Sequence, residues 1–339
     1  MIDKSIKVSI IVAVYNSIQY LEQCVHSLMA QTYDNYEIIF IDDASTDSSY
    51  KLLKTILAEY PSLSDKWNII RNDKNMGIGY SRRSAMQKAT GEYMIHVDSD
   101  DYVDNTFVER LVEKAQTENA DIVICNTANV VNDKISFNDL ENITDKSELI
   151  KRLLIGTFHN ALWNKLIKSS IIVENELYPE EIFRIMEDKS IMFRCVYFAD
   201  KIAYLNQPLY YYRKTRNSLT GSEGSGQWVL PPMLDRLIEL VDEFFTQHQA
   251  DETINQGIKL FKIGAAASLL LYKNEVKKDI IKNASIREIF SNTYIPRYYK
   301  YALICSKYHL GFIVKLLQLI IRIKFKCNDR RKKNNNGWG

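Results

Sequence analysis

Residues 91–101 read GEYMIHVDSDD, an apolar run that ends in three aspartates. The run from Glu92 to Val97 has the length and composition of a buried strand. Helical patterns flank it, one ending near Gly91 as its C′ residue and one covering about 104–118. A strand between two helices is typical of an α/β sheet that is covered by helices on both faces.

The same alternation of strand and helix extends over the first 126 residues. Apolar runs predict further strands at Lys7–Tyr15, Tyr36–Ile41, Trp67–Arg71 and Asp121–Asn126. Helices are predicted from Ser17, as N-cap, to about Gln31, over about 47–60, and from the Gly77/Gly79 loop to Thr90. The predicted fold class is therefore α/β, with a Rossmann-like, mostly parallel sheet and helices on both faces.

The remainder of the chain is divided by composition. Residues 127–215 are less regular, with helices near 146–155 and 187–199 and strands near 201–205 and 208–213. The stretch 221–227 is rich in glycine and serine, which predicts a linker. We therefore expect a first domain over 1–220, an α-helical C-terminal region over 228–328 and a disordered tail over 329–339.

Composition excludes several classes of protein. The 339 residues are 46% hydrophobic and 25% charged, with a net charge of +2, so the chain is neither disordered nor a typical nucleic-acid binder. The five cysteines have neither zinc-ligand spacing nor the pattern of a disulfide framework, which favours a reducing, cytoplasmic compartment. We find no run of 18 uncharged apolar residues and expect no transmembrane helix.

The aspartates after the 92–97 strand predict a metal site. Asp98 and Asp100 stand at i and i+2, which places both side chains on one side of an extended backbone. Together with Asp101 they offer the hard oxygen ligands that suit Mg²⁺ or Mn²⁺. The alternative is that one aspartate caps the next helix and the others are solvated.

A second acidic pair, Asp42 and Asp43, follows the 36–41 strand. A carboxylate there can accept a hydrogen bond from a uracil N3–H or a ribose hydroxyl, whereas the alternative is an Asx turn at the start of a helix. Arg82, early in a predicted helix, and Arg213 and Ser218 are candidates for phosphate contacts, with solvated surface residues as the alternative.

The middle of the chain carries further candidates. Glu187 and Asp188 open a predicted helix, either as a general base or as acids that interact well with the helix dipole. Trp163 has the ring to stack on a sugar face, although packing is the more frequent role. His159 is a candidate acid or base, against the commoner structural histidine.

Taken together, these segments resemble the family 2 glycosyltransferases, nucleotide-sugar enzymes with the GT-A fold. The resemblance covers about residues 6–220 and leaves out the last third. The matching pieces are 8–16, 27–32, 41–47, Asn75, Gly77, Arg82, 91–93, 98–101, 163–165 and 187–188. The chain departs from the family pattern at Arg82-Arg83, where Arg-Asn is usual, and at Ala13, where many members have Pro or Thr.

The resemblance implies a role for each matching residue. Donor binding falls to Ala13, Tyr15, Asp42, Asp43, Arg82, Asp98, Arg213 and Ser218. Asp98 and Asp100 would be the metal ligands, with Asp100 the more direct one. Asp188 would be the general base, and Trp163 and Glu187 would lie on the acceptor side.

The resemblance also implies the reaction. Members of this type transfer a sugar with inversion from a nucleotide diphosphate, here expected to be UDP, with Mn²⁺ or Mg²⁺ as cofactor. The expected acceptor is a hydroxyl of a glycan or a polyprenyl-linked glycan in surface polysaccharide synthesis. The alternatives are a phosphatase of the haloacid dehalogenase type, which also has D-x-D after a strand, and a non-catalytic nucleotide-sugar-binding subunit.

The predicted helix over 310–327 carries one polar stripe, formed by Lys315, Gln318, Arg322 and Lys326, on an otherwise apolar sequence. A basic amphipathic helix of this kind suits an anionic bilayer surface. We therefore expect a cytoplasmic protein that contacts the inner face of the cell membrane. The alternatives are packing of the helix on the enzyme body or on a second copy in a homodimer.

Overall fold

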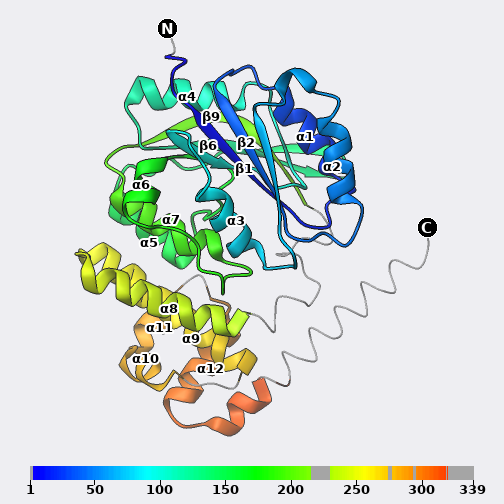
Figure 1. Ribbon diagram of the computed structural model, residues 1–339. Coiled ribbons are helices and arrows are strands. Elements are labelled where there is room, and N and C mark those ends of the chain that lie inside the picture. Colours follow the sequence, from blue (N-terminus) through cyan, green and yellow to red (C-terminus); the bar gives the residue numbers. More distant parts are fainter. Residues whose placement is uncertain (1–2, 215–229, 274–276, 293–294, 318, 320–339) are drawn as a thin grey trace. The chain divides into compact units, whose positions relative to one another are not determined.

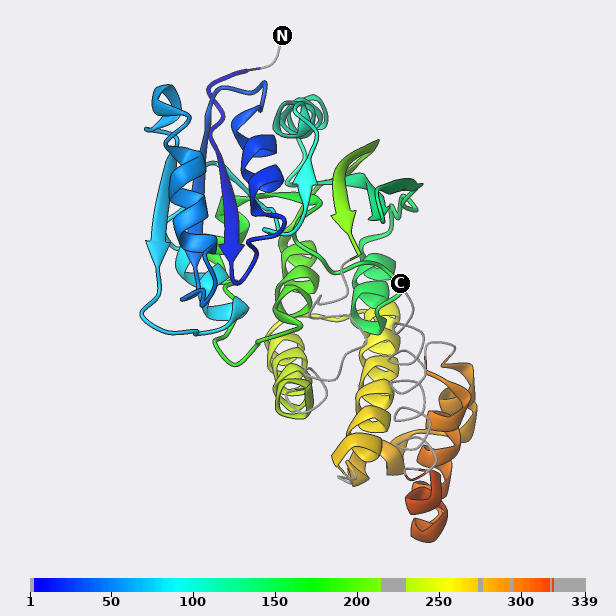
Figure 2. The same ribbon diagram turned by 90° about the vertical axis from the view of Figure 1, so that its right-hand side faces the viewer.

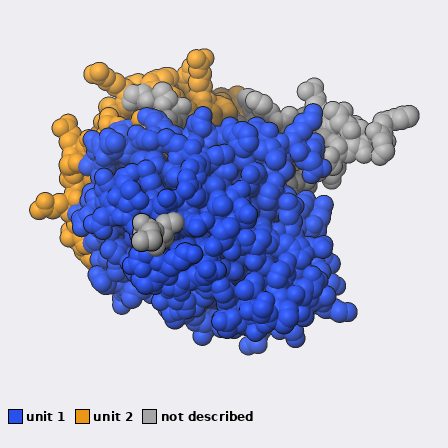
Figure 3. All heavy atoms as spheres, turned by 90° about the horizontal axis from the view of Figure 1, so that it is seen from above, with its two compact units in different colours: residues 1–149, 160–215 blue, residues 150–159, 216–339 orange. Residues whose placement is uncertain are grey.

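The computed structural model describes residues 3–214, 230–273, 277–292, 295–317 and 319. The chain divides into two compact units, one of residues 1–149 and 160–215 and the other of residues 150–159 and 216–339 (Figure 3). The short segment 150–159 thus joins the second unit, which the domain boundary expected at residue 220 did not foresee. The linker expected at 221–227 and the tail expected at 329–339 lie outside the described residues.

The described residues of the first unit form a nine-stranded sheet in the order β3-β2-β1-β4-β8-β6-β9-β5, with β7 paired to β6. Its strands are β1 (Val8–Val14), β2 (Tyr36–Asp42), β3 (Trp67–Arg71), β4 (Tyr93–His96), β5 (Tyr102–Val103), β6 (Ile122–Val131), β7 (Lys134–Asn138), β8 (Lys165–Lys168) and β9 (Ile202–Arg213). The α/β fold class is confirmed. The expected parallel arrangement holds for β3-β2-β1-β4 and for β6-β9, whereas β4-β8, β8-β6, β6-β7 and β9-β5 are antiparallel, so the sheet is mixed.

Helices cover both faces of this sheet. They are α1 (Leu21–Met29), α2 (Ser49–Leu57), α3 (Ile78–Met86), α4 (Phe107–Glu118), α6 (Ser169–Glu174) and α7 (Glu187–Phe198), with a 3₁₀ turn, η1 (Pro61–Leu63). A further helix, α5 (Lys146–Ile155), begins in this unit and ends in the second. Figures 1 and 2 show α1 and α2 side by side, and the two helices are in contact. Val8, Ile10 and Val12 join the core cluster of α1, α2 and α4, while Ile11 between them is buried outside that cluster. Both faces of β1 are therefore buried, which is why apolar residues occupy alternate and intervening positions of this strand.

Two local expectations were wrong. Helix α1 begins at Leu21 rather than after Ser17, and the Ser17 hydroxyl instead lies 2.6 Å from that of Ser99 in the loop after β4. Gly91 does not end a helix, because α3 ends at Met86. A Cβ at Gly91 would lie 2.6 Å from the Ser9 nitrogen, so glycine is needed for close approach to β1.

The second unit is helical where it is described, as expected for the C-terminal region. Its helices are α8 (Leu230–Gln247), α9 (Glu252–Lys273), α10 (Lys278–Asn283), α11 (Ile286–Ser291) and α12 (Arg297–Lys307), and residues 311–317 are also helical. A small core includes Ile263, Leu270, Ile281, Leu303 and Val314. Among the described helices, we find none that is long and apolar enough to cross a bilayer.

Candidate functional site

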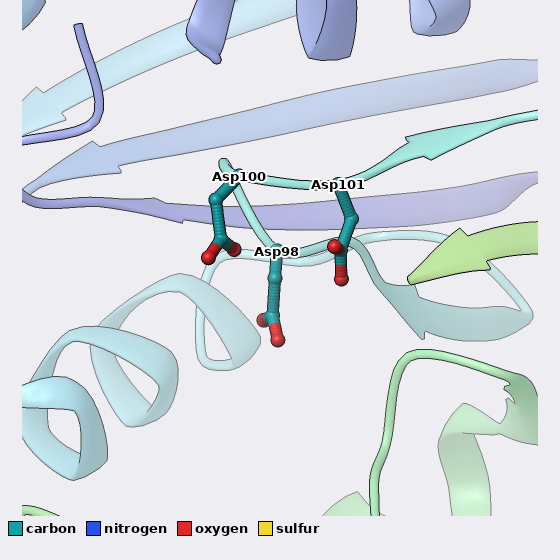
Figure 4. Close-up of side chains that lie close together, drawn as sticks. All are labelled: Asp98, Asp100 and Asp101. Atoms are coloured by element: carbon teal, nitrogen blue, oxygen red, sulfur yellow. The ribbon is translucent and has the colours of Figure 1, made fainter. Parts of the chain in front are cut away.

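The aspartates that follow β4 form a compact acidic cluster. One carboxylate oxygen of each of Asp98, Asp100 and Asp101 lies within 4.8 Å of the others. Figure 4 shows the three side chains extending to the same side of the loop between β4 and β5. The chain brings them together because β4 ends at His96 and the antiparallel pairing of β5 with β9 fixes the far end of a short loop.

Asp101 anchors this loop to β9. Its two oxygens accept hydrogen bonds from the Tyr210 hydroxyl, at 2.8 Å, and from the backbone nitrogen of Arg213, at 2.7 Å. The Tyr210 oxygen in turn accepts one from the backbone nitrogen of Asp98, at 3.0 Å. Asp101 and Tyr210 are both fully buried. Asp101 is therefore occupied by its own chain, and Asp98 and Asp100 are left as the more open pair.

Asp100 is a partly shielded carboxylate close to a second negative charge, which is an environment suited to a cation. Burial, followed by the nearby charge of Asp98, raises the pKa of Asp100 to about 6. No side chain of the described residues donates a hydrogen bond to it. Clustered carboxylates that are partly shielded from water and lack enough counter-charge match the donor set of a hard divalent cation. The residues present thus fit Mg²⁺ or Mn²⁺.

Arg213, a candidate for a phosphate contact, lies beside this cluster. Its Nη1 donates to the backbone oxygen of Asp100 at 2.8 Å, and its Nη2 donates to Gln23 of α1. The guanidinium carbon lies 4.7 Å from the ring centre of Tyr102 and 5.2 Å from that of Tyr20. These contacts hold a positive charge at the edge of the acidic loop. Ser218, its expected partner, lies outside the described residues.

Arg82 joins the acidic cluster to helix α7. Its Nη2 lies 2.6 Å from Asp98 Oδ1, and its Nη1 forms an ion pair with Glu187, the first residue of α7. Burial opposes the charge of Arg82, but Asp98 and Glu187 outweigh that effect and raise its pKa. Asp188, the expected base, is half-buried, and its Oδ1 accepts a hydrogen bond from the Lys189 nitrogen at 2.6 Å. One arginine therefore links Asp98, a metal candidate, to Glu187, which directly precedes the base candidate Asp188.

The residues that we expected to bind the nucleotide lie where β1 and β2 end. Asp43 Oδ1 accepts hydrogen bonds from Asn72 Nδ2 at 2.7 Å and Met76 N at 2.8 Å, and its Oδ2 accepts one from Gly77 N at 2.8 Å. Asp42 is buried with Oδ2 3.1 Å from Arg71 Nε, while its Oδ1 has no hydrogen-bond partner within the described chain. Asp43 therefore shapes the loop before α3, which begins after Gly77 at a φ of 92°.

Ala13 and Tyr15 border the same strand ends. Ala13 pairs with Ile41 across the β1–β2 ladder and is half-buried, while Tyr15 is exposed. The backbone nitrogen of Asp43 donates to the Val14 oxygen at 2.9 Å, so all these residues are held close together. Ala13, Tyr15, Asp42 and Asp43 thus lie together where β1 and β2 end.

Trp163 is buried and stacks on Tyr210, with ring centres 4.3 Å apart, and on Tyr212, at 5.4 Å. These contacts support the packing alternative for Trp163. Lys165, two residues further on, is also buried, and its Nζ donates to the Ala161 oxygen at 2.6 Å and to Asn164 Oδ1 at 2.8 Å. Burial lowers the pKa of Lys165 to about 7, although the negative charge of Asp188 acts in the opposite direction. His159 belongs to the second unit.

Sequence reasoning missed Tyr210, Gln23 and Tyr20. Tyr210 is the first of three consecutive tyrosines. The alternation of side chains along a strand, together with the register of β9, is needed to tell that Tyr210 is the buried one. Gln23 and Tyr20 lie in and before α1, almost 200 residues from Arg213 in sequence, so no local pattern could have paired them.

Comparison with known proteins places these features in a family. The model described as Glycosyl transferase family 2 matches residues 9–183. EpsH of Bacillus subtilis, a protein named as a glycosyltransferase, is 35% identical over 213 residues, which are 61% of this chain and 60% of EpsH. The alignment thus spans less than two thirds of that relative.

Solved structures share the fold. Residues 1–349 of TarS from S. aureus, in complex with UDP-GlcNAc, match with a TM-score of 0.67 at 17% identity, covering 94% of this chain and 92% of that one. The mannosyltransferase PcManGT from Pyrobaculum calidifontis, in complex with GDP-Man and Mn²⁺, matches with a TM-score of 0.52 at 13% identity, covering 96% and 89%.

Proposed function

This chain belongs to glycosyl transferase family 2 and is a glycosyltransferase, and from that premise we propose that it transfers a hexose from a UDP-sugar, with inversion, to a hydroxyl of a glycan or polyprenyl-linked acceptor. The observation that carries the proposal is the link from the acidic cluster through Arg82 to the helix that bears Asp188. UDP is favoured by TarS, which is similar in fold and was solved with UDP-GlcNAc. The phosphatase alternative does not survive the family assignment.

In the proposed reaction the acceptor oxygen attacks the anomeric carbon while the bond from that carbon to the diphosphate oxygen breaks. Asp188 takes the acceptor proton, and the nucleoside diphosphate leaves with the bonding electrons. Arg213, held beside Asp100, would contact the diphosphate. Asp42 and Asp43 support the strand ends that would receive the nucleoside, with Ala13 and Tyr15 at their border.

Asp98 and Asp100 would hold Mn²⁺ or Mg²⁺, with Asp101 fixed behind them by Tyr210. A divalent cation bound there supplies charge that stabilises the departing diphosphate. The carboxylates keep the loop in place, and Arg213 adds a fixed positive charge at its edge.

The test is a thermal-shift screen of UDP-, GDP- and dTDP-sugars with and without Mn²⁺, followed by assay of nucleotide release. We expect a UDP-sugar to stabilise the protein only when Mn²⁺ is present. Asp100→Ala should abolish this metal-dependent binding, and Asp188→Asn should bind the donor normally but lose turnover. Release of UDP by Asp188→Asn at the wild-type rate would remove Asp188 as the base. Donor binding without any release by the wild type would favour the non-catalytic subunit.

We also propose that the second unit contacts an anionic bilayer, where a lipid-linked acceptor would be found. In the helical stretch 311–317, Val314 packs into the core of this unit. Phe312, Leu316 and Leu319, at i, i+4 and i+7, are instead exposed, with Phe312 79% accessible. This exposed apolar stripe, beside the exposed Lys315, supports a helix that lies at a membrane interface. The sequence that follows, 322–333, is rich in lysine and arginine.

Co-sedimentation of the full chain with phosphatidylglycerol vesicles tests this. Phe312→Asp should weaken binding at least about tenfold, whereas Phe137→Asp, which replaces a 66% exposed phenylalanine in the first unit, should not. Equal pelleting of the two variants would contradict the proposal. If the wild type ignores vesicles but forms a dimer that Phe312→Asp dissociates, the stripe is instead a homodimer surface.

A further inference from the structure

The ion-pair bridge formed by Asp98, Arg82 and Glu187 joins three separate elements of the first unit. Arg82 lies in the second turn of α3, Asp98 lies in the loop after β4, and Glu187 is the first residue of α7. Arg82 is 5% accessible and Glu187 is 7% accessible. The Asp98 side chain is 28% accessible, so the bridge is buried at Arg82 and Glu187 and partly open at Asp98, with two carboxylates sharing one guanidinium.

Burial and pairing leave Arg82 and Glu187 badly placed to bind substrates. Both terminal nitrogens of Arg82 already donate to carboxylates, so a diphosphate would have to compete with two existing ion pairs, one of them buried. Glu187 is turned inward toward Arg82, whereas Asp188, the next residue, remains half-open. Two acids that are adjacent in sequence thus have different surroundings.

The start of α7 depends on this bridge. The residue before the helix, Met186, has a left-handed φ of 68°, and no side chain caps the helix there. The bond from Arg82 to Glu187 holds the first residue of the helix by its side chain, and the Ser190 hydroxyl donates to the Glu187 backbone oxygen at 2.6 Å. Because Asp188 follows directly, its position relative to Asp98 is set by Arg82.

We infer that Arg82 and Glu187 are positioning residues, which touch neither donor nor acceptor and hold the base Asp188 at a fixed place beside the acidic cluster. The inference rests on the proposed function and revises the roles that the resemblance implied for these two residues. A misplacement of a reacting group by about 1 Å can reduce a rate about 100-fold without weakening substrate binding. Loss of the bridge should therefore lower kcat and leave donor affinity nearly unchanged.

The test uses hydrolysis of the UDP-sugar that gives the largest thermal shift with Mn²⁺, because water then serves as the acceptor. The variants are Glu187→Gln, Arg82→Lys and Asp188→Asn, with Glu37→Gln as a matched control. Glu37 forms an ion pair with Lys7 at 2.9 Å and bonds to Ser9 and Thr90 at the opposite end of β1. Release of UDP gives kcat and KM, and calorimetry gives the affinity for UDP with Mn²⁺.

We expect Glu187→Gln to lower kcat about 10- to 100-fold, with KM and the affinity for UDP and Mn²⁺ within about threefold of the wild type. Glu37→Gln should leave kcat unchanged. Unchanged kcat for hydrolysis by Glu187→Gln would overturn the inference. That result would fit the acceptor-binding role of Glu187, because a residue that binds the acceptor is not needed when water is the acceptor. A large rise in KM for Arg82→Lys at normal kcat would also overturn it, because Arg82 would then bind the donor.

The two possible failures give different results. If the proposed function is wrong, the wild type releases no UDP or Asp188→Asn is as active as the wild type. If only this inference is wrong, Asp188→Asn is inactive while Glu187→Gln keeps its kcat. Thermal unfolding of each variant identifies any loss of fold, and Glu187→Asp, which keeps the charge but shortens the side chain, should recover part of the rate if the ion pair is what matters.

Discussion

Replacing Tyr210 by phenylalanine removes the hydroxyl that ties the acidic loop to β9. In the folded protein this oxygen donates to Asp101 at 2.8 Å and accepts from the Asp98 nitrogen at 3.0 Å, in a fully buried position. The ring itself, stacked on Trp163, is retained. The substitution therefore isolates two hydrogen bonds from the packing around them.

The expected cost follows from those two bonds. A buried polar group left without its partner costs about 1–3 kcal/mol, and here one partner is a carboxylate and the other a backbone N–H. The Arg213 nitrogen continues to donate to Asp101, so we take a total loss of about 3 kcal/mol. For a unit of this size such a loss lowers Tm by about 6–12 °C.

Urea and thermal unfolding of the two proteins measure this loss. Tyr211→Phe is the matched control, since Tyr211 is the next residue of the same strand and is half-exposed, stacked on Tyr102 at 4.6 Å. Its loss of a hydroxyl should change the free energy of unfolding by less than about 0.5 kcal/mol. We further expect Mn²⁺ affinity to fall at least about tenfold in Tyr210→Phe. Equal stability of the two variants would refute the reasoning.

Three other outcomes are expected. The pKa of Lys165 is about 7 in the folded protein, against an ordinary value of 10.5, so between these pH values the unfolded state binds more protons than the folded state. The free energy of unfolding of the wild type should therefore rise with pH, by about 2–3 kcal/mol relative to Lys165→Met, from pH 7 to pH 9. Urea unfolding at the two pH values measures this difference. Gly79→Ala places a Cβ 2.4 Å from the Phe183 oxygen and should cost about 1–3 kcal/mol in thermal unfolding, while Gly311→Ala, with open space around it, should cost little. Ser285→Ala removes the capping box of α11 and should destabilise the second unit by about 1 kcal/mol, which its urea transition would report.

The local amino-acid pattern was sufficient to predict the strands β1 to β4 and approximately where they end. β1 to β4 are apolar runs bounded by polar residues, and the position of acids after β2 and β4 follows from the strands themselves. The α/β class therefore follows from local amino-acid pattern, as does the i, i+2 spacing that puts Asp98 near Asp100, while the pairing of β5 with β9 fixes the loop that holds them.

Very short strands and contacts between residues far apart in sequence could not be predicted from local amino-acid pattern. β8 has four residues with lysine at both ends, and β5 has two, so neither gives a periodic signal. The bond between Arg82 and Glu187 joins residues 105 positions apart, and its presence changes the surroundings of Glu187 from an exposed helix start to a buried ion pair. The role of Asp188 is a prediction that the proposed assays address, and the roles of Asp43 and Ala13 also remain predictions.

The ladder between β6 and β9 loses its regular register near Asn126, where Cys125 pairs with Leu205 but Thr127 pairs with Tyr210. Three additional residues of β9 are accommodated in this interval, while Ile202–Tyr204 stay in step with Ile122–Ile124. An insertion or deletion at 206–209 would thus redirect Tyr210 and Arg213 without shifting the upstream pairing. A change of strand length at this irregularity would therefore move Tyr210 and Arg213 relative to the acidic loop while the start of the β6–β9 ladder stays in register.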